Sequence, residues 1–202
     1  MKALIDNYDL YFRFIEDALP GGFKLVDRKS PSILKLEELT AANNQFFLVS
    51  DLMALKIIFT SRRSADMLGV EPDDLDPSVF FKSMHPDDQR RYHTGQTKLF
   101  NLAHRIFIEK TGRAVISRNF RFKNSSGEYV NTLVQYYLFF SDVPYETVFL
   151  FQVLTDISWF TNLMPWFHFY IGRDPSFFRY PDEYLLQMGN IFTPGNLRSL
   201  NL

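Results

Sequence analysis

The sequence has no cysteine among its 202 residues. This absence excludes a disulfide framework, a thiolate metal site and a cysteine nucleophile. Long hydrophobic runs are also missing, because the longest ones, such as residues 136–140, fall far short of the roughly 18 residues that span a bilayer. A secretion signal is not evident, since Asp6 and Asp9 interrupt the stretch where its apolar segment would lie. We therefore expect a cytoplasmic protein with no membrane partner.

The chain also lacks an excess of either charge, because 22 basic and 23 acidic residues give a net charge of −1. Residues 82–123 differ, with ten Lys or Arg against three acidic residues. One interpretation is a basic stripe for an anionic partner. The other, which we favour, is the solvated face of a helix and one strand. We expect no direct contact with nucleic acid.

Phenylalanine, by contrast, is unusually frequent, with 22 residues in an aromatic fraction of 17%. So much aromatic surface has to be buried, which excludes a largely disordered chain. The length suits one generous domain, or one ordinary domain with extensions. The phenylalanines either fill one face of a sheet or line a pocket there, and the sequence leaves both interpretations open.

Hydrophobic periodicity and turn residues predict the order of the elements. Residues 4–19 form an amphipathic pattern, and a second short helix follows with Ser30 as its cap and Pro31 at its first position. The predicted helices after these are residues 61–68, residues 78–84 and a long helix that starts at Pro86. The predicted strands are residues 45–50, 56–60, 116–123, 129–141 and 146–157. This order indicates an α+β domain with a five-stranded antiparallel sheet and helices on one face.

The same patterns divide the chain into three parts. Residues 1–42 form an N-terminal helical extension, residues 43–158 the α+β domain, and residues 159–202 a C-terminal extension. Within the last part, residues 166–171 are aromatic and strand-like, whereas residues 173–180 are typical of a loop.

Three motifs lie between these elements in order. They are Phe80-Phe81-x-x-x-His85-Pro86-Asp87-Asp88 before the long helix, Gly127-Glu128-Tyr129 before the long strand, and Asp156-Ile157-Ser158 at the end of the last strand. With them, residues 45–158 resemble a PAS domain of the subgroup with HPDD and DIT-like motifs. The resemblance implies a sensory or interaction module in signal transduction or transcription regulation.

Much of this motif chemistry is structural. Pro86 suits a first helical position, Asp87 and Asp88 face the positive end of the helix dipole, and His85 sits where a cap belongs. Helix initiation explains these residues better than a metal site does. The resemblance implies that Asp156 and Ile157 couple the sheet to an output segment; the alternative for Asp156 is a strand-end acid paired with a nearby arginine.

The resemblance also raises cofactors, which the residues restrict. Cysteinyl-flavin photochemistry and thiol-linked chromophores are excluded because there is no cysteine. Haem PAS domains use a histidine on the long helix, and His93 and His104 lie there. A lone helical histidine is more often solvated or simply hydrogen-bonded, so we do not expect haem, and the cofactor stays unknown.

A small, non-covalent apolar ligand fits the sequence better. A pocket for it needs a few polar groups on an apolar wall. The candidate ligand-binding residues are Phe100, His104, Arg118, Phe120, Gln135 and Gln152. The competing interpretation is a filled core, with Arg118 extending its charged end to an edge.

Enzyme signatures are absent from the sequence, which has no glycine-rich phosphate loop, nucleophile elbow or His-Glu-x-x-His pattern. We therefore expect a binding module that is not an enzyme and whose partner is a small ligand or a protein. The alternative is a small enzyme or ligand carrier on a similar curved sheet, with His104 and Arg118 as its candidate residues.

Both ends of the chain suggest further relationships. The region around residues 166–190 resembles the sensor part of bacterial LuxR-type regulators, in which a helix-turn-helix would begin near residue 191. The nine residues after Thr193 are too few for that unit, so we expect no DNA-binding domain here. The aromatic helix 4–19 predicts a homodimer through this helix and the sheet; the alternative is that it caps its own sheet.

Overall fold

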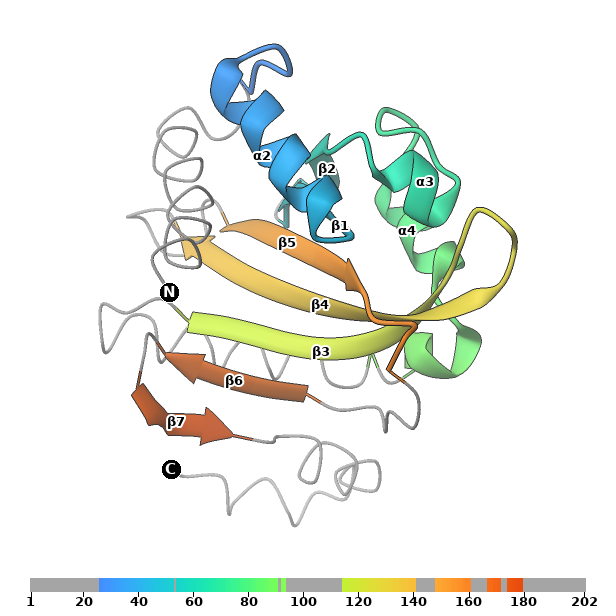
Figure 1. Cartoon of the computed structure of the whole chain (residues 1–202). Coiled ribbons are helices and arrows are strands. Elements are labelled where there is room, and N and C mark those ends of the chain that lie inside the picture. Colours follow the sequence, from blue (N-terminus) through green and yellow to red (C-terminus); the bar gives the residue numbers. More distant parts are fainter. Residues whose placement is uncertain are drawn as a thin grey trace.

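The computed structural model describes residues 26–52, 54–90, 92–93, 114–140, 148–160, 167–171 and 174–179. The predicted helix 4–19, and with it the predicted dimer surface, lies outside these residues, as does the predicted long helix beyond residue 93. Within the described part, one antiparallel sheet forms the centre of the molecule, and helices pack against it (Figure 1).

The strands follow the order β2–β1–β5–β4–β3–β6–β7 across the sheet. The first five in this order are the predicted strands, and each neighbouring pair is antiparallel. Their bounds are β1 Gln45–Asp51, β2 Lys56–Thr60, β3 Ala114–Lys123, β4 Tyr129–Phe140 and β5 Val148–Asp156. The predicted fold class, an α+β domain with a five-stranded antiparallel sheet and helices, is confirmed.

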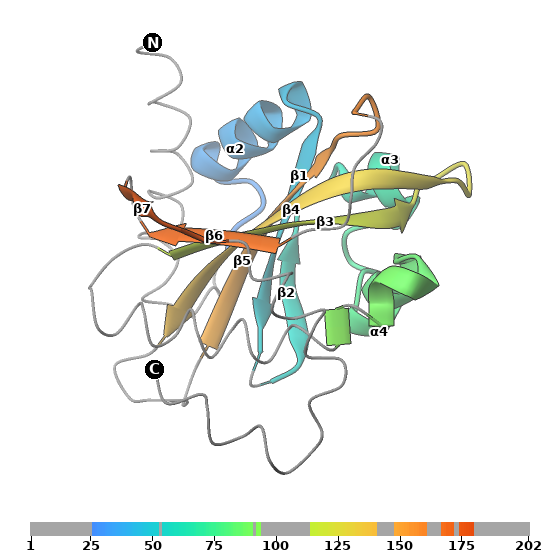
Figure 2. The ribbon, with the colours of Figure 1, turned by 90° about the horizontal axis from the view of Figure 1, so that it is seen from below.

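The C-terminal extension adds two strands to this sheet. β6, Phe167–Ile171, pairs with β3, and β7, Asp174–Arg179, pairs with β6 (Figure 2). β6 agrees with the strand-like pattern of residues 166–171. The predicted loop at residues 173–180 is wrong, because most of it forms β7. Asp174 and Pro175 favour a turn locally, but pairing with β6, which no local pattern reveals, sets the extended conformation.

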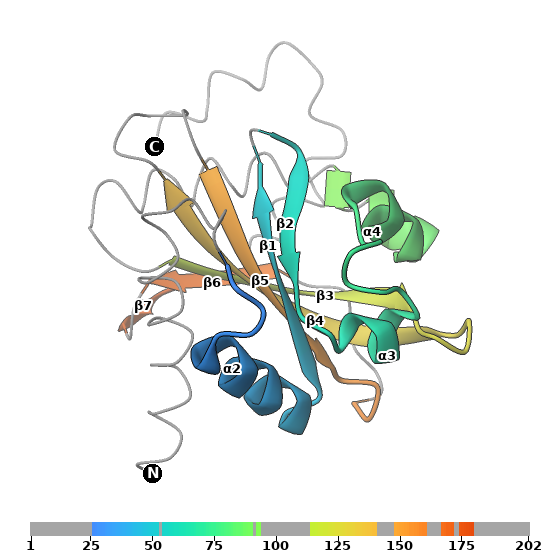
Figure 3. The same cartoon turned by 90° about the horizontal axis from the view of Figure 1, so that it is seen from above.

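Helix α2, Pro31–Ala42, begins as predicted. The Ser30 hydroxyl accepts a hydrogen bond from the Ile33 amide at 3.3 Å, and Pro31 occupies the first turn. Ile33 and Leu36 are buried in one cluster with Phe47 and Phe151 of the sheet. Figure 3 shows α2 lying well apart from the other two labelled helices, α3 and α4.

Helices α3, Ser64–Leu68, and α4, Pro77–Ser83, are short and cover the opposite face of the sheet. α3 ends at Gly69, whose φ of 69° is left-handed and suits glycine. A side chain there would also meet the Cα of Ser125 at 3.0 Å. α4 is capped by Asp76, whose carboxylate accepts a hydrogen bond from the Val79 amide at 2.7 Å.

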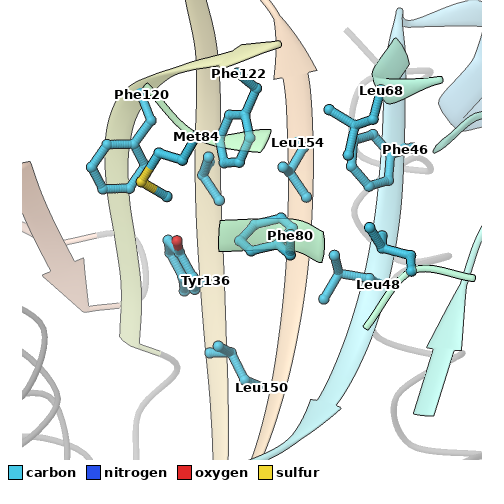
Figure 4. Close-up of a cluster of buried hydrophobic side chains, with 12 residues drawn as sticks. Phe46, Leu48, Leu68, Phe80, Met84, Phe120, Phe122, Tyr136, Leu150 and Leu154 are labelled. Atoms are coloured by element: carbon cyan, nitrogen blue, oxygen red, sulfur yellow. The ribbon is translucent and has the colours of Figure 1, made fainter. Parts of the chain in front are cut away.

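Two hydrophobic clusters therefore enclose the sheet. We call the face covered by α3 and α4 the inner face, and the face covered by α2 the outer face. Figure 4 shows Phe80 of α4 among the strand side chains of the inner face. The buried hydrophobic residues of this cluster are Phe46, Leu48, Leu68, Leu75, Phe80, Met84, Phe120, Phe122, Val134, Tyr136, Leu150 and Leu154. The helices thus lie on one face, as predicted, apart from N-terminal α2.

Among the helices of the described residues, none combines the length and the apolar character needed to cross a membrane.

Candidate functional site

Arg118 of β3 is buried on the inner face, with an exposure of only 1%. Its guanidinium carbon lies 4.3 Å from the ring centre of Tyr92, 4.5 Å from that of Phe120 and 4.1 Å from that of Tyr136. Its Nη2 also donates a hydrogen bond to the Tyr136 hydroxyl. Ring faces attract a cation, and arginine stays protonated in proteins. A permanent positive charge therefore lies inside the domain, and the competing interpretation, in which Arg118 extends its charged end to an edge, is wrong.

The three rings come from different elements. Phe120 lies two residues after Arg118 on β3, and Tyr136 projects from β4 toward the same face (Figure 4). Tyr92 belongs to helical residues 92–93, just after the helical stretch 86–90. Its ring packs edge-on against Phe81 at 4.9 Å between centroids. The position of Tyr92 over Arg118 therefore depends on where that helix begins.

An ion pair between a buried carboxylate and a partly exposed arginine holds the start of that helix on β3. Asp88 is 3% exposed and accepts three hydrogen bonds from Arg121, from the backbone N at 2.7 Å, Nε at 3.0 Å and Nη2 at 2.8 Å. In return, the His85 amide donates to the Arg121 carbonyl at 2.8 Å. The hydrogen bond that Arg121 donates to Asp88 raises the pKa of Arg121 above its ordinary value, against the opposing effect of burial. We call this arrangement the Asp88–Arg121 clamp.

His85 caps the helix, as predicted. Its carbonyl accepts hydrogen bonds from the amides of Asp88 and Gln89, at 2.9 and 3.0 Å, and its Nδ1 accepts one from the Asp87 amide at 3.3 Å. Asp87 and Asp88 share the first turn but differ in environment. The Asp87 side chain is 78% exposed, and its carboxylate lies 3.5 Å from Nη2 of Arg121. The sequence did not distinguish these two acids.

A second polar contact lies on the same face. Gln152 of β5 is 6% exposed and donates from Nε2 to the Ser50 hydroxyl at 3.4 Å. Gln152 is also the direct cross-strand neighbour of Tyr136. Arg118, Tyr136, Gln152 and Ser50 thus form a row across β3, β4, β5 and β1, which we call the inner polar row. Such a row can orient one polar group of a small molecule against an apolar wall.

The structure brings three of the predicted ligand-binding residues to one face and separates a fourth. Arg118, Phe120 and Gln152 share the inner face. Gln135 lies on the outer face, because it is the cross-strand neighbour of Ser117 and of Val153, an outer-face residue. Its predicted grouping with the others in one pocket wall is therefore wrong. The cause is its position in β4, one residue before the inner-face Tyr136, since successive strand residues alternate between faces.

Two other candidates, Phe100 and His104, fall outside the described residues. His93, the other histidine considered for haem, is exposed and packs near the rings of Phe81 and Tyr92, at 5.7 and 5.6 Å. No group of three potential metal-ligating side chains occurs within the described stretches.

Asp156 and Ile157 lie where β5 leaves the sheet. The Asp156 amide donates to the Asn44 carbonyl at 3.1 Å, and the Ile157 amide donates to the Asn131 carbonyl at 2.9 Å. The Asp156 carboxylate accepts from the Ser158 amide at 2.8 Å. Of the basic side chains in the described segments, none forms an ion pair with Asp156. The carboxylate therefore orders the turn that leads into the C-terminal extension.

In the described part of the chain, surface hollows lie near this junction and near α2. The smaller, of about 160 Å³, is lined in part by Asp156, Arg63 and Asn124. The larger, of about 440 Å³, lies between α2 and the start of α3. Neither is lined by a residue of the inner polar row.

Sequence reasoning missed the aromatic enclosure and the clamp. In the sequence, Tyr92 is only one residue of the predicted long helix, and Tyr136 only one residue of the predicted strand 129–141. Strand alternation places Arg121 on the opposite face from Arg118, but nothing local reveals its contact with Asp88. The contact joins residues 33 positions apart, so only the folded chain brings them together.

A match to a protein-family model agrees with this architecture. Residues 57–144 match a protein-family model described as PAS fold. No curated protein matches the chain. Among solved structures, it is similar to the N-terminal domain of a diguanylate cyclase with PAS/PAC sensor from Marinobacter aquaeolei, with a TM-score of 0.41 and 16% identity over 57% of this chain and 96% of that one.

Two further solved structures are similar at the same level. One is a sensory box histidine kinase/response regulator from Burkholderia thailandensis, with a TM-score of 0.41 and 14% identity, over 61% of this chain and 85% of that one. The other is the PAS-B domain of Drosophila melanogaster Cycle with bound ethylene glycol, with a TM-score of 0.40 and 14% identity, over 55% of this chain and 99% of that one.

Proposed function

We propose that this chain, whose central segment matches the PAS fold, is a sensory module of a signalling or transcription-regulating protein. The inner face of its sheet binds a small, largely apolar molecule around Arg118. The module acts by ligand-dependent movement of the segments around Asp156, and it does not contact DNA itself. A homodimer through residues 4–19 remains part of this proposal.

The buried guanidinium of Arg118 is the observation that carries the proposal. A domain with only structural needs is more stable with an apolar residue at a fully buried position, because desolvating a charge is costly. Here the charge is kept, and three aromatic rings surround it at 4.1 to 4.5 Å. Gln152 and Ser50 extend the polar row beside it. Polar groups within an aromatic wall are the features that orient a small ligand.

Native mass spectrometry of the freshly purified chain, with an absorbance spectrum, tests this function. We expect a non-covalent bound mass in the wild type and in Arg62→Lys, a matched control at a side chain that is 63% exposed. Arg118→Leu and Arg118→Lys should lose the bound mass, the first by removing the charge and the second by removing the planar group between the rings.

A thermal-shift panel of metabolites complements that experiment. A true ligand at 100 times its Kd stabilises the folded state by about 2.7 kcal/mol, or about 5–11 °C for a chain of this size. An unliganded wild type whose melting temperature no metabolite changes would overturn the ligand-sensing function.

A protein-interaction module is the second candidate, and one observation favours it. Trp159 is 76% exposed and Phe160 48%, and their rings pack edge-to-face at 5.6 Å directly after the Asp156 turn. Exposed aromatic residues are common in protein interfaces. If Trp159→Ala abolishes recovery of a partner in a pull-down while Arg118→Lys does not, the interaction function is favoured. A small enzyme or carrier would instead require turnover or transfer of the bound molecule.

A further inference from the structure

Each strand has two hydrogen-bonding edges. One edge of β3 pairs with β4 over residues 115–123, and the other, which we call the β3 edge, is covered by two different partners. Along the β3 edge, β6 pairs with residues 114–118. Further along, Phe122 forms a bridge to Met84, and the Arg121 carbonyl accepts a hydrogen bond from the His85 amide. The helix start therefore holds one end of this edge, and the C-terminal extension holds the other.

These two partners meet next to Arg118. The β6 ladder begins with Phe167 opposite Arg118. Three residues further along β3, Arg121 carries the clamp that positions the helix start. The same helix supplies Tyr92, which lies over the Arg118 guanidinium at 4.3 Å. A movement of Tyr92 away from Arg118 would therefore disturb β3 at the same residue that pairs with Phe167, the first residue of β6.

β6 and β7 together form what we call the C-terminal strap. An isolated two-stranded ribbon is only marginally stable in water, so the order of the strap depends on the β3 edge. β6 contacts that edge over five residue pairs, against nine between β3 and β4. The β6–β7 ladder is also irregular between Phe169 and Ile171. β6 and β7 stand at one end of the strand order, so their detachment leaves the ladders among β1 to β5 in place.

We propose that the C-terminal strap is a detachable arm whose attachment to the β3 edge depends on the packing around Arg118. When Tyr92 covers Arg118, β3 is held in place and β6 pairs along residues 114–118. When that packing is disturbed, β6 and β7 leave the edge and the C-terminal extension is released. This inference rests on the site of the proposed function but requires no ligand, so it is tested separately.

The absence of cysteine makes the test direct, because an engineered pair meets no other cysteine within its own chain. Ser117 stands between two cross-strand neighbours, Gln135 on β4 and His168 on β6. The Ser117 hydroxyl is buried, without a hydrogen-bond partner in the described part of the chain, so cysteine is a mild replacement. The double variant Ser117→Cys/His168→Cys reports on the strap, and Ser117→Cys/Gln135→Cys is its matched control within the core.

Both full-length double variants are oxidised with and without Tyr92→Leu, and disulfide formation is followed over time. We expect both pairs to cross-link in the parent background. Tyr92→Leu should slow the β6 pair at least about fivefold, the lower end of common allosteric couplings, and leave the control pair unchanged. Hydrogen exchange should show the same change, with faster exchange at residues 167–171 than in β4.

Two results would overturn the inference. If the control pair cross-links and the β6 pair does not, the strap is not on the β3 edge. If both cross-link equally in the two backgrounds, the strap is attached but independent of the Arg118 packing. Should Tyr92→Leu fail to fold, Arg118→Lys takes its place with the same expected result.

Discussion

Removing the buried carboxylate of the Asp88–Arg121 clamp should destabilise the protein far more than removing its exposed neighbour. Asp88→Ala deletes three hydrogen bonds at 2.7 to 3.0 Å from Arg121. Asp87→Asn, one position earlier, alters a carboxylate that is 78% exposed and 3.5 Å from the same guanidinium. The two substitutions act on the same turn of helix and the same arginine, so their difference isolates burial and hydrogen bonding.

The magnitude follows from the two ends of the pair. A hydrogen bond to a charged group contributes about 1.5–3 kcal/mol, and the loss of the acceptor leaves the Arg121 amide without its partner. The guanidinium side chain is 36% exposed, so it can turn to water, and its loss costs only about 1 kcal/mol, as for surface pairs. We therefore expect Asp88→Ala to lower the free energy of unfolding by about 3 kcal/mol. Asp88→Asn should lower it by about 2 kcal/mol, because the amide oxygen can still accept the hydrogen bond from the Arg121 backbone amide.

Urea denaturation followed by circular dichroism measures these differences, provided that the slopes of the variants agree. The expected loss for Asp88→Ala corresponds to about 6–12 °C in melting temperature. Asp87→Asn should stay within about 0.5 kcal/mol of the wild type, as surface substitutions do. Equal effects of the two substitutions, or a loss below about 1 kcal/mol for Asp88→Ala, would refute the reasoning.

The pH dependence of the clamp has a defined sign for Arg121. The hydrogen bond to Asp88 raises the pKa of Arg121 in the folded state. A raised pKa contributes stability below the ordinary arginine value and loses it only as pH rises through the folded value. Because that range is strongly alkaline, deprotonation of Arg121 does not weaken the clamp at neutral or mildly basic pH.

Further stability predictions concern turns and caps, all measured by the same urea assay. Gly69→Ala should cost about 2–3 kcal/mol, because it forces a left-handed φ of 69° on alanine and places a Cβ 3.0 Å from the Ser125 backbone. Gly127→Ala, at a φ of 87° but with its nearest contact at 3.7 Å, should cost only about 1–2 kcal/mol; equal losses would show that the close approach contributes nothing. Asp76→Ala should cost about 1 kcal/mol by removing the cap on Val79, and an unchanged midpoint would contradict that cap.

The strands and short helices were predictable because their signals are local. Alternating residues, a serine or aspartate cap and Gly69 each specify a conformation without knowledge of distant partners. β7 was missed for the opposite reason, since only its pairing with β6 makes residues 174–179 extended. In the same way, the sequence names Arg118 as a buried candidate or an edge residue, and only the rings that surround it decide between them.

Gln135 shows a second limit of sequence reasoning. Gln135 and Gln152 look equivalent, since both lie in aromatic strands. Their faces depend on cross-strand register, which pairs Gln135 with Val153 and Tyr136 with Gln152. A shift of one residue would exchange the two assignments. The sequence contains the alternation but not the register.

β1 poses a register problem of its own, because residues 46–50 are buried in succession. A strand with one solvent-exposed face resists a one-residue shift in register, since the shift would expose its apolar side chains. In β1 the shift would merely exchange Phe46 and Leu48 with Phe47 and Val49 between the two hydrophobic clusters.

The protection against mispairing must then come from polar contacts that only one alignment satisfies. Gln45 binds Thr155 at 2.9 Å, the Phe47 amide binds the Ser61 hydroxyl at 2.9 Å, and Gln152 binds Ser50. These few side chains therefore specify the register of β1 during folding. Their replacement by apolar residues of similar size would leave the burial intact but remove the contacts that favour the native register.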